Sequence, residues 1–383
     1  MDASTELATL LRPAGGGLYV VSTGRAEQLA LQKALYGASD EAGVVARWRE
    51  ALGRIAQADV LLLGVPSDVG AGFVRGASLG PQAIRTTLLA RADYRDLAAR
   101  ARLVDLGDVF VVPQLLHDEM LGAGQLEASR RALYPELPEA ERAALPVSPL
   151  SIAERALRLA LTLNPRARLL VFGGDHSNSW PVTAALHEVH GDELAIVQFD
   201  AHTDLLEERL GVRYCFATWS YHANDRLGRR GRLVQLGTRA SRRDEVHWES
   251  TLDVRQWWAS ECNAKGEEAI DDVLAHLRAI GARKVYVSND IDGTDASFAD
   301  ATGTPEPGGL TPAFVGRVIE RLGQELDVVA GDVMEVAPPI ARTPDGAART
   351  LSLAADYVCE TLRAMLRGRE APRARHGHVT PRV

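Results

Sequence analysis

The sequence predicts a single α/β domain built on a doubly wound parallel sheet with helices on both faces, a three-layer α/β/α arrangement. Two observations predict it. Continuously apolar runs of strand length recur along the chain, and amphipathic segments of helix length separate them. Parallel strands show unbroken apolar runs because helices cover both faces of their sheet. Regular alternation of strands and helices therefore favours one parallel sheet.

Three parts of the chain differ in character. Residues 1–57 precede the alternation and are expected to form an N-terminal extension. Residues 58–367 carry the alternation and form the main domain, which is interrupted by an expected insertion at 110–150, a segment rich in Leu, Glu and Pro. The basic tail, residues 368–383, is expected to be mobile.

The individual elements follow from local signals. Pro81 suits the first turn of one helix, and Ser151 with Glu154 matches a capping box at the start of another. Strands are expected at 18–24, 60–66, 102–109, 168–174, 194–200, 232–238, 284–292 and 328–336. Helices are expected at 26–35, 41–55, 80–90, 151–163, 180–190, 268–280, 311–326 and 348–367.

Composition excludes several classes of protein. Of the 383 residues, 46% are apolar and 25% charged, which is ordinary for a globular chain. The formal charge of −8 argues against nucleic acid as a partner, because such a surface needs clustered Lys and Arg. No apolar stretch is long enough for a membrane span, and no secretory signal is visible. Three cysteines form no disulfide framework, so a reducing, cytoplasmic location is expected.

Acidic clusters follow three of the expected strands. They are GGDHS (173–177), DAHTD (200–204) and NDIDGTD (289–295), and two of them include a histidine. Ligands of open α/β sheets bind outside the carboxyl ends of the strands. We therefore expect the chemistry of this protein at that edge of its sheet.

The spacing of these acids indicates a metal site. Buried carboxylates need a compensating cation. Side chains at alternate positions of an extended segment share a face, so Asp200, His202 and Asp204 are expected to point the same way. Asp290 and Asp292 are expected to share a face for the same reason.

With His176, the inventory is four carboxylates and two imidazoles. One divalent ion would usually need fewer ligands, whereas two ions sharing carboxylates would use all six and balance their charge. Oxygen donors with some imidazole suit Mn²⁺ best, and Zn²⁺, Co²⁺ or Ni²⁺ are possible. A water between two such ions would ionise near neutral pH and supply a hydroxide nucleophile.

The clusters resemble the metal-binding signatures of the ureohydrolase family, which includes arginases, agmatinases and related guanidino hydrolases. Further resemblance lies in GVPSDVGAGFVRGASLGPQAIR (64–85), DLGDV (105–109), ATGTPEPGGLTP (301–312) and DVMEV (332–336). It covers residues from about 59 to 365. It implies a parallel sheet with flanking helices, two Mn²⁺ ions and assembly as a homo-oligomer, a trimer or hexamer.

The resemblance also implies roles for single residues. Asp204 would orient the bridging hydroxide, Glu335 would accept the guanidinium of the substrate, and Asp295 would support the site from behind. Hydroxide attack on the guanidinium carbon would then release urea and an amine. One ion would be held by His176, Asp200, Asp204 and Asp290, and the other by Asp200, His202, Asp290 and Asp292.

One segment departs from the family pattern. Where the family carries a histidine in a segment such as SHGT, this chain has RYCFATWSYH (213–222), with Phe216 at that position. Phenylalanine cannot transfer a proton. His222 could reach the site and act as the third catalytic residue. Alternatively, solvent or Tyr214 could relay protons while Phe216 and Trp219 line an apolar pocket, or the chain could be inactive.

We therefore expect a dinuclear-metal hydrolase that cleaves a guanidino C–N bond of a small guanidine compound. The family loop that grips an α-amino acid is not recognisable, so arginine is not the expected substrate, and an agmatine-like amine remains open. One alternative is a catalytically silent partner subunit. Another is hydrolysis of a different C–N bond, such as that of a formimino group. Neither nucleic acid nor a membrane is expected as a partner.

Overall fold

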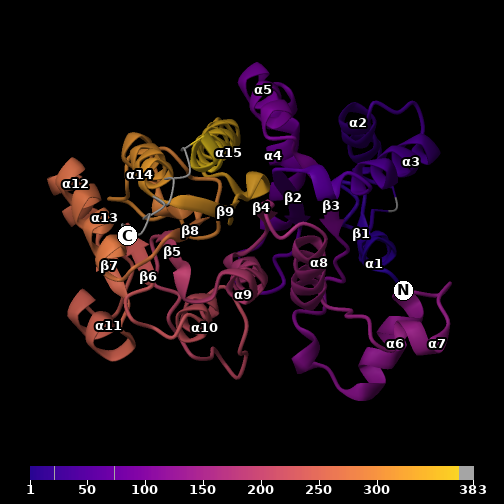
Figure 1. Ribbon diagram of the computed structural model, residues 1–383, viewed down its shortest axis with the longest axis horizontal. Coiled ribbons are helices and arrows are strands. Elements are labelled where there is room, and N and C mark those ends of the chain that lie inside the picture. Colours follow the sequence, from indigo (N-terminus) through magenta and orange to yellow (C-terminus); the bar gives the residue numbers. More distant parts are fainter. Residues whose placement is uncertain (21, 73, 371–383) are drawn as a thin grey trace, which may run out of the picture.

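The computed structural model describes residues 1–20, 22–72 and 74–370. A nine-stranded sheet with the order β1-β3-β2-β4-β9-β8-β5-β6-β7 forms its middle layer. Every neighbouring pair is parallel except β1 with β3. Helices lie on both faces of the sheet (Figure 1). The predicted three-layer α/β/α fold is confirmed.

The strands and helices have the following bounds. The strands are β1 (Leu11–Arg12), β2 (Val60–Val65), β3 (Val104–Val109), β4 (Arg168–Gly173), β5 (Leu194–Phe199), β6 (Leu233–Leu236), β7 (Arg255–Trp257), β8 (Lys284–Asn289) and β9 (Asp327–Val333). The helices are α1 (Ala3–Leu10), α2 (Arg25–Tyr36), α3 (Glu41–Leu52), α4 (Gly80–Leu89), α5 (Ala92–Arg100), α6 (Ala123–Leu133), α7 (Glu139–Arg142), α8 (Pro149–Leu163), α9 (Ser179–His190), α10 (Trp219–Arg226), α11 (Glu245–Leu252), α12 (Ala259–Lys265), α13 (Glu267–Ala279), α14 (Pro312–Glu325) and α15 (Gly346–Glu370).

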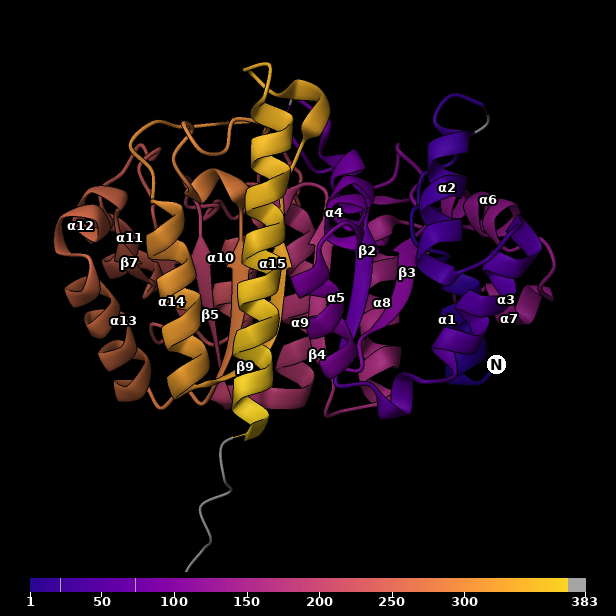
Figure 2. The same cartoon turned by 90° about the horizontal axis from the view of Figure 1, so that it is seen from above.

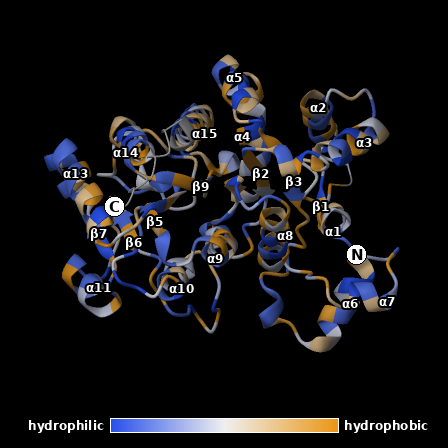
Figure 3. Ribbon diagram, viewed as in Figure 1, coloured by the Kyte–Doolittle hydropathy of each residue, from blue (hydrophilic) through white to orange (hydrophobic). Residues whose placement is uncertain are grey.

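The sheet separates two apolar cores. Side chains alternate between its faces, so Leu61 and Leu63 of β2 belong to the core on one face, which also includes residues of α1, α3, α8, α9 and α10. Leu62, between them, belongs to the core on the opposite face, which also includes residues of α4, α5, α13, α14 and α15. Figure 2 shows α14 and α15 lying along that face, and Figure 3 shows apolar residues on the strands and on the helices beside them. Burial on both faces explains why the strands appeared as unbroken apolar runs.

The N-terminal residues add an edge to the sheet. β1 pairs antiparallel with β3, and Asp108 of β3 accepts a hydrogen bond from the backbone N–H of Gly15 at 2.7 Å. The strand expected at 18–24 is wrong. In the described part of that segment only Leu18 forms a bridge, with Val111. Its partner Val111 lies two residues beyond the end of β3.

The start of α8 also differs from the expectation. The helix begins at Pro149, preceded by Ser148, and no capping box forms. The hydroxyl of Ser151 instead accepts a hydrogen bond from the N–H of Asp118 at 3.0 Å. Proline is well suited to the first helical turn, and here it sets the boundary two residues earlier.

Several elements were missed by the sequence analysis. They include β7 and the short helices α5, α10, α11 and α12, and the segment 110–150 contains α6 and α7. The expected mobile tail lies outside the described residues from 371 onward, while 368–370 belong to α15. In the described ranges no helix combines the length and apolarity needed to cross a lipid bilayer.

Candidate metal centre

Four adjacent strands deliver the candidate residues to one edge of the sheet. β4, β9, β8 and β5 are neighbours in that order. His176 follows β4, Glu335 follows β9, Asp290 follows β8 and Asp200 follows β5. Because these strands are parallel, their carboxyl ends meet, and residues more than 150 positions apart in the chain become neighbours.

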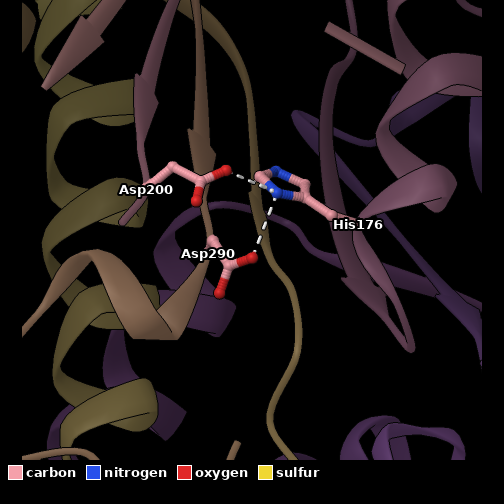
Figure 4. A group of neighbouring side chains, drawn as sticks. All are labelled: His176, Asp200 and Asp290. Atoms are coloured by element: carbon pink, nitrogen blue, oxygen red, sulfur yellow. Dashed lines mark ion pairs between the residues drawn. The ribbon is translucent and has the colours of Figure 1, made fainter. Parts of the chain in front are cut away.

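The first group of side chains surrounds His176. Its Nδ1 atom lies 3.0 Å from Oδ2 of Asp200, 3.1 Å from Oδ2 of Asp290 and 3.3 Å from Oδ2 of Asp204. Figure 4 shows the two aspartates Asp200 and Asp290 pointing at the imidazole ring. The imidazole and these three carboxylates are almost completely buried.

The second group shares Asp200 with the first. Nδ1 of His202 lies 3.2 Å from Oδ2 of Asp292 and 3.5 Å from Oδ1 of Asp200. The two oxygens of Asp200 thus face the two imidazoles separately. The side chain of His202 is 27% exposed, so this group forms the more open side of the centre.

The six predicted ligands converge, but an extended backbone is not the reason. β5 ends at Phe199, and the chain then turns, with the N–H of His202 donating to Oδ1 of Asp200 at 2.6 Å. Asp204 adopts a left-handed backbone conformation with φ of 52°. Similarly, a short 3-10 turn follows Asp290, whose carboxylate accepts from the N–H of Asp292 at 2.9 Å. Turns therefore bring these residues together, contrary to the shared strand face that we expected.

The electrostatics of the cluster call for additional positive charge. Burial, followed by repulsion from Asp292 and Asp200, raises the pKa of Asp290 well above its usual value. Burial and Asp200 raise the pKa of Asp204 to about 7. Burial opposes protonation of His176, but its contacts with the surrounding aspartates outweigh this and raise its pKa well above the usual value. In the metal-free cluster Asp290 and Asp204 therefore resist ionisation, and a bound cation would favour their charged forms.

The residues present fit two divalent cations. Nδ1 of His176 is buried and has no hydrogen-bond partner among the described residues, although three carboxylate oxygens surround it. In its neutral form, a buried imidazole nitrogen that faces three carboxylate oxygens is well placed to ligate a metal ion. The two candidate ligand groups are His176, Asp200 and Asp290, and Asp200, His202 and Asp292. Four carboxylates match the charge of two such ions, and the mixture of oxygen and imidazole donors suits Mn²⁺ and its neighbours in the first row.

A hydrogen-bond network fixes the ring of His176 from behind. Its Nε2 atom lies 3.1 Å from the hydroxyl of Ser288. Ser288 contacts Asp332 of β9 at 3.2 Å, and the hydroxyls of Ser179 and Tyr286 also donate to that carboxylate. Such partners orient a ligating imidazole and select its tautomer. Asp332 was missed as a site residue, although an acid within an apolar strand was a visible signal.

Glu335 borders the cluster in a strained conformation. It has φ of 61°, and its N–H donates to the carbonyl of Gly174 at 2.8 Å. Its Oε1 accepts from the N–H of His176 at 3.1 Å. Burial, with the nearby charge of Asp290, raises its pKa well above the usual value. A buried carboxylate of this kind gains from pairing with a cationic substrate group. Gly174 is required here, since a Cβ would lie only 2.0 Å from the carbonyl oxygen of Ser67.

The structure places His222 against backbone carbonyls of its own loop. Its Nε2 lies 3.0 Å from the carbonyl oxygens of both Glu207 and Arg213. Its ring packs against Tyr214, at 5.0 Å between centroids. His222 thus holds the loop that precedes α10, and this geometry argues against the interpretation in which it reaches the predicted ligands.

Phe216 lies on this loop, against the segment that follows β2. Its N–H donates to the carbonyl of Gly70 at 3.1 Å, and a Cβ on Gly72 would lie 3.7 Å from its ring. The guanidinium of Arg209 lies 4.7 Å from the ring centroid. Phe216 is therefore half-buried between the loop and the glycine-rich segment.

Two further polar contacts were missed. Arg239, just after β6, donates to the backbone carbonyl of Asp292 at 2.7 Å. The hydroxyl of Thr304 donates to Oδ2 of Asp292 at 3.0 Å. Asking which polar residue follows each strand would have found Arg239. Asp295, predicted as a support, accepts from the N–H groups of Ser297 and Gly309, both at 2.9 Å, and so braces the following loop.

Comparisons with known proteins agree with this geometry. The family model described as "Arginase family" matches residues 58–363. The chain is 30% identical to an agmatinase from Chromobacterium violaceum, over 86% of this chain and 92% of that protein. It is 27% identical to a guanidinobutyrase from Pseudomonas aeruginosa, over 79% and 86%. The structure of proclavaminate amidino hydrolase from Streptomyces clavuligerus is similar, with a TM-score of 0.64 and 30% identity, covering 81% of this chain and 92% of the other.

Proposed function

The chain belongs to the arginase family and is a hydrolase of guanidino compounds, and on this premise we propose that it uses two divalent cations to cleave a guanidino C–N bond of a small guanidine compound, giving urea and an amine. The predicted ureohydrolase membership is confirmed. The observation that carries the proposal is the sharing of Asp200 between two carboxylate–imidazole groups beside Glu335. We take Mn²⁺ as the first candidate, with Ni²⁺, Co²⁺ and Zn²⁺ as alternatives.

We assign metal-binding and substrate-binding roles to the clustered residues as follows. His176, Asp200, Asp204 and Asp290 would hold one ion, and Asp200, His202, Asp290 and Asp292 the other. Cations bound there would supply a hydroxide nucleophile at neutral pH and polarise the substrate. Glu335 would pair with the guanidinium and hold its carbon beside the cluster, because charge-assisted hydrogen bonds to a planar cation fix its orientation. Asp204 would orient the attacking oxygen through a hydrogen bond.

A small substrate is supported by the residues that border Glu335. A Cβ on Gly303 would lie 3.9 Å from Oε2 of Glu335 and 3.4 Å from the carbonyl oxygen of Val74. The segment that contains Val74 also contains Gly72, which lies against Phe216. Gly303 and the carbonyl of Val74 thus lie close to the proposed guanidinium site, and Phe216 lies against Gly72 in the same part of the chain. We propose that they favour a compact guanidine over arginine, whose α-amino and carboxylate groups would need polar partners.

The test is a panel of guanidine compounds with product identification. Metal-free protein is loaded with Mn²⁺ or Ni²⁺ and incubated with guanidines whose arms increase in length and polarity, including agmatine and arginine. We expect urea and the matching amine from the shorter compounds. Glu335→Gln is the matched variant, which should retain the ions and lose turnover.

Two outcomes would contradict the proposal in different ways. Two bound ions per chain without turnover of any compound would favour a silent partner subunit, the alternative that Phe216 supports. Formamide from a formimino compound, with no urea from any guanidine, would favour hydrolysis of a different C–N bond. The expected cytoplasmic location and the trimer or hexamer stay predictions, and light scattering on the metal-loaded protein tests the second.

A further inference from the structure

Trp219 contacts two of the predicted ligands at once. It is the first residue of α10 and is 0% exposed. Its indole Nε1–H donates a hydrogen bond to Oδ2 of Asp204 at 3.0 Å. Its ring lies against the imidazole of His176, with centroids 4.6 Å apart and an interplanar angle of 39°. One side chain therefore links the ends of β4 and β5.

The start of α10 is itself fixed to the site. The hydroxyl of Thr218 donates to the carbonyl of Arg213 at 2.6 Å and accepts from the N–H of Cys215 at 2.9 Å. On the other side, Ser220 donates to the amide oxygen of Gln198 at 2.8 Å. Gln198 in turn donates to Oδ2 of Asp200 at 2.7 Å. The indole is consequently held in one position relative to the carboxylates.

Asp204 needs such a constraint more than the other ligands. Its backbone is in the left-handed region, with φ of 52°, a conformation that persists in a non-glycine residue only when the surroundings determine it. An indole N–H is a donor only, and a hydrogen bond from it to a buried carboxylate is stronger than one between neutral groups. The contact therefore selects one rotamer of the Asp204 carboxylate.

We propose that Trp219 is a positioning residue for one of the two ions, that of His176, Asp200, Asp204 and Asp290. It holds the carboxylate of Asp204 through its N–H and the ring of His176 through its face, so that both are already placed when the ion binds. The inference rests on the proposed two-ion site. It gives Trp219 a role in metal binding, whereas the sequence analysis expected it only to line an apolar pocket.

The test compares two tryptophan variants. Trp219→Phe removes the N–H and keeps an aromatic ring. Trp180→Phe is the matched control, because Trp180 is equally part of a buried aromatic group, stacking on Tyr214 at 5.0 Å, and its Nε1 has no hydrogen-bond partner in the described part of the chain. Metal-free proteins are titrated with Mn²⁺ by calorimetry and by electron paramagnetic resonance.

We expect Trp219→Phe to bind one Mn²⁺ about 10–100-fold more weakly, as is typical when a partner of a metal ligand is lost. The second Mn²⁺ should bind as in the wild type, and Trp180→Phe should bind both unchanged. Wild-type affinity for both ions in Trp219→Phe would overturn the inference. Equal weakening of both ions together with a lowered melting temperature would also overturn it, because that pattern indicates a merely structural role.

A second substitution removes the N–H with less disturbance. Trp219→β-(3-benzothienyl)alanine places sulfur where the indole N–H stands and preserves the shape of the ring, so it decides the matter if Trp219→Phe does not fold. The same selective loss of one ion is expected, and unchanged affinities would refute the inference. Failure of the proposed two-ion site is distinguishable, since the wild-type protein itself would then bind no stoichiometric metal. Failure of the proposed reaction alone would show as two bound ions without turnover in the wild type, and would leave the difference in Mn²⁺ affinity between the variants as expected.

Discussion

Replacing Asp290 by asparagine should lower the free energy of unfolding of the metal-loaded protein and raise that of the metal-free protein. The side chain is buried between Asp200 and Asp292, both of which disfavour its charge, and it is proposed to ligate both ions. Asparagine keeps the shape and can still accept the hydrogen bond from the N–H of Asp292. The substitution thus changes the charge with little change in packing.

The two effects have opposite signs. Without metal, the oxygens of Asp200 and Asp290 lie within 4.8 Å of each other, a repulsion of about 3 kcal/mol at an effective dielectric of ~20. Burial and Asp292 add to this cost, whereas protonated His176, 3.1 Å away, offsets part of it. Because the balance still raises the pKa of Asp290, the net gain in Asp290→Asn is positive and below about 3 kcal/mol. With metal, an ion at ~1,000 times its dissociation constant stabilises by about 4 kcal/mol, and the variant loses this for one or both ions.

The pH dependence has a definite sign. The pKa of Asp290 is raised above 3.8 in the folded metal-free chain, so the unfolded state is favoured increasingly as pH rises above that value. The higher free energy of unfolding of metal-free Asp290→Asn, relative to metal-free wild type, should therefore be observed at neutral pH. It should vanish below about pH 4, where the carboxyl is protonated in both states.

Urea unfolding measures all of this. Wild type and variant are compared at pH 7.5 and pH 4, with Mn²⁺ or after chelation, and metal content is determined in parallel. Asp295→Asn is the control, because it removes a charge at the same edge of the sheet from a residue that braces a loop. If metal-free Asp290→Asn were less stable than metal-free wild type at pH 7.5, the electrostatic account of the cluster would be wrong.

Two further predictions concern packing and specificity. Arg85→Met should lower the free energy of unfolding, measured by urea titration, by about 3–5 kcal/mol, because it leaves two buried carboxylates without their cation. Arg131→Met, which breaks an exposed ion pair, is the control and should lower the free energy of unfolding by less than about 1 kcal/mol. Equal losses in the two variants would contradict this prediction. Phe216→Ala should raise kcat/KM for agmatine relative to methylguanidine about 10-fold or more, the scale of a pocket that gains or loses a methylene. Phe110→Ala is the control, because Phe110 also packs below an arginine, Arg12, but lines a different pocket. It should leave the ratio of the two kcat/KM values unchanged.

The fold could be predicted from the sequence because strands that are buried on both faces appear as apolar runs. The strands from β2 to β9, except β7, were predicted within a few residues, since most of them are runs of largely apolar residues. β7 was missed because a three-residue strand at the edge of the sheet is too short to give such a run. The capping box at Ser151 failed for another reason: its hydroxyl found a partner in Asp118, more than thirty residues away in the chain.

The sequence also allowed us to predict which side chains cluster at the strand ends. Parallel strands present their carboxyl ends together, so acids and histidines after β4, β5 and β8 had to meet. It could not show how they meet. The face-sharing expected for Asp200, His202 and Asp204 was replaced by turns, because the backbone stops being extended as soon as the sheet ends.

What the sequence determined by itself is the layered fold and the kind of chemistry at the strand ends, since both follow from local pattern and strand direction. What only the tertiary structure decided is which side chains of the 205–222 segment face that chemistry. His222 was expected there, yet its ring nitrogen lies by two loop carbonyls. Trp219 instead donates to Asp204. A helix that starts one residue earlier or later would turn a different side chain inward, and that choice is made by packing between distant segments.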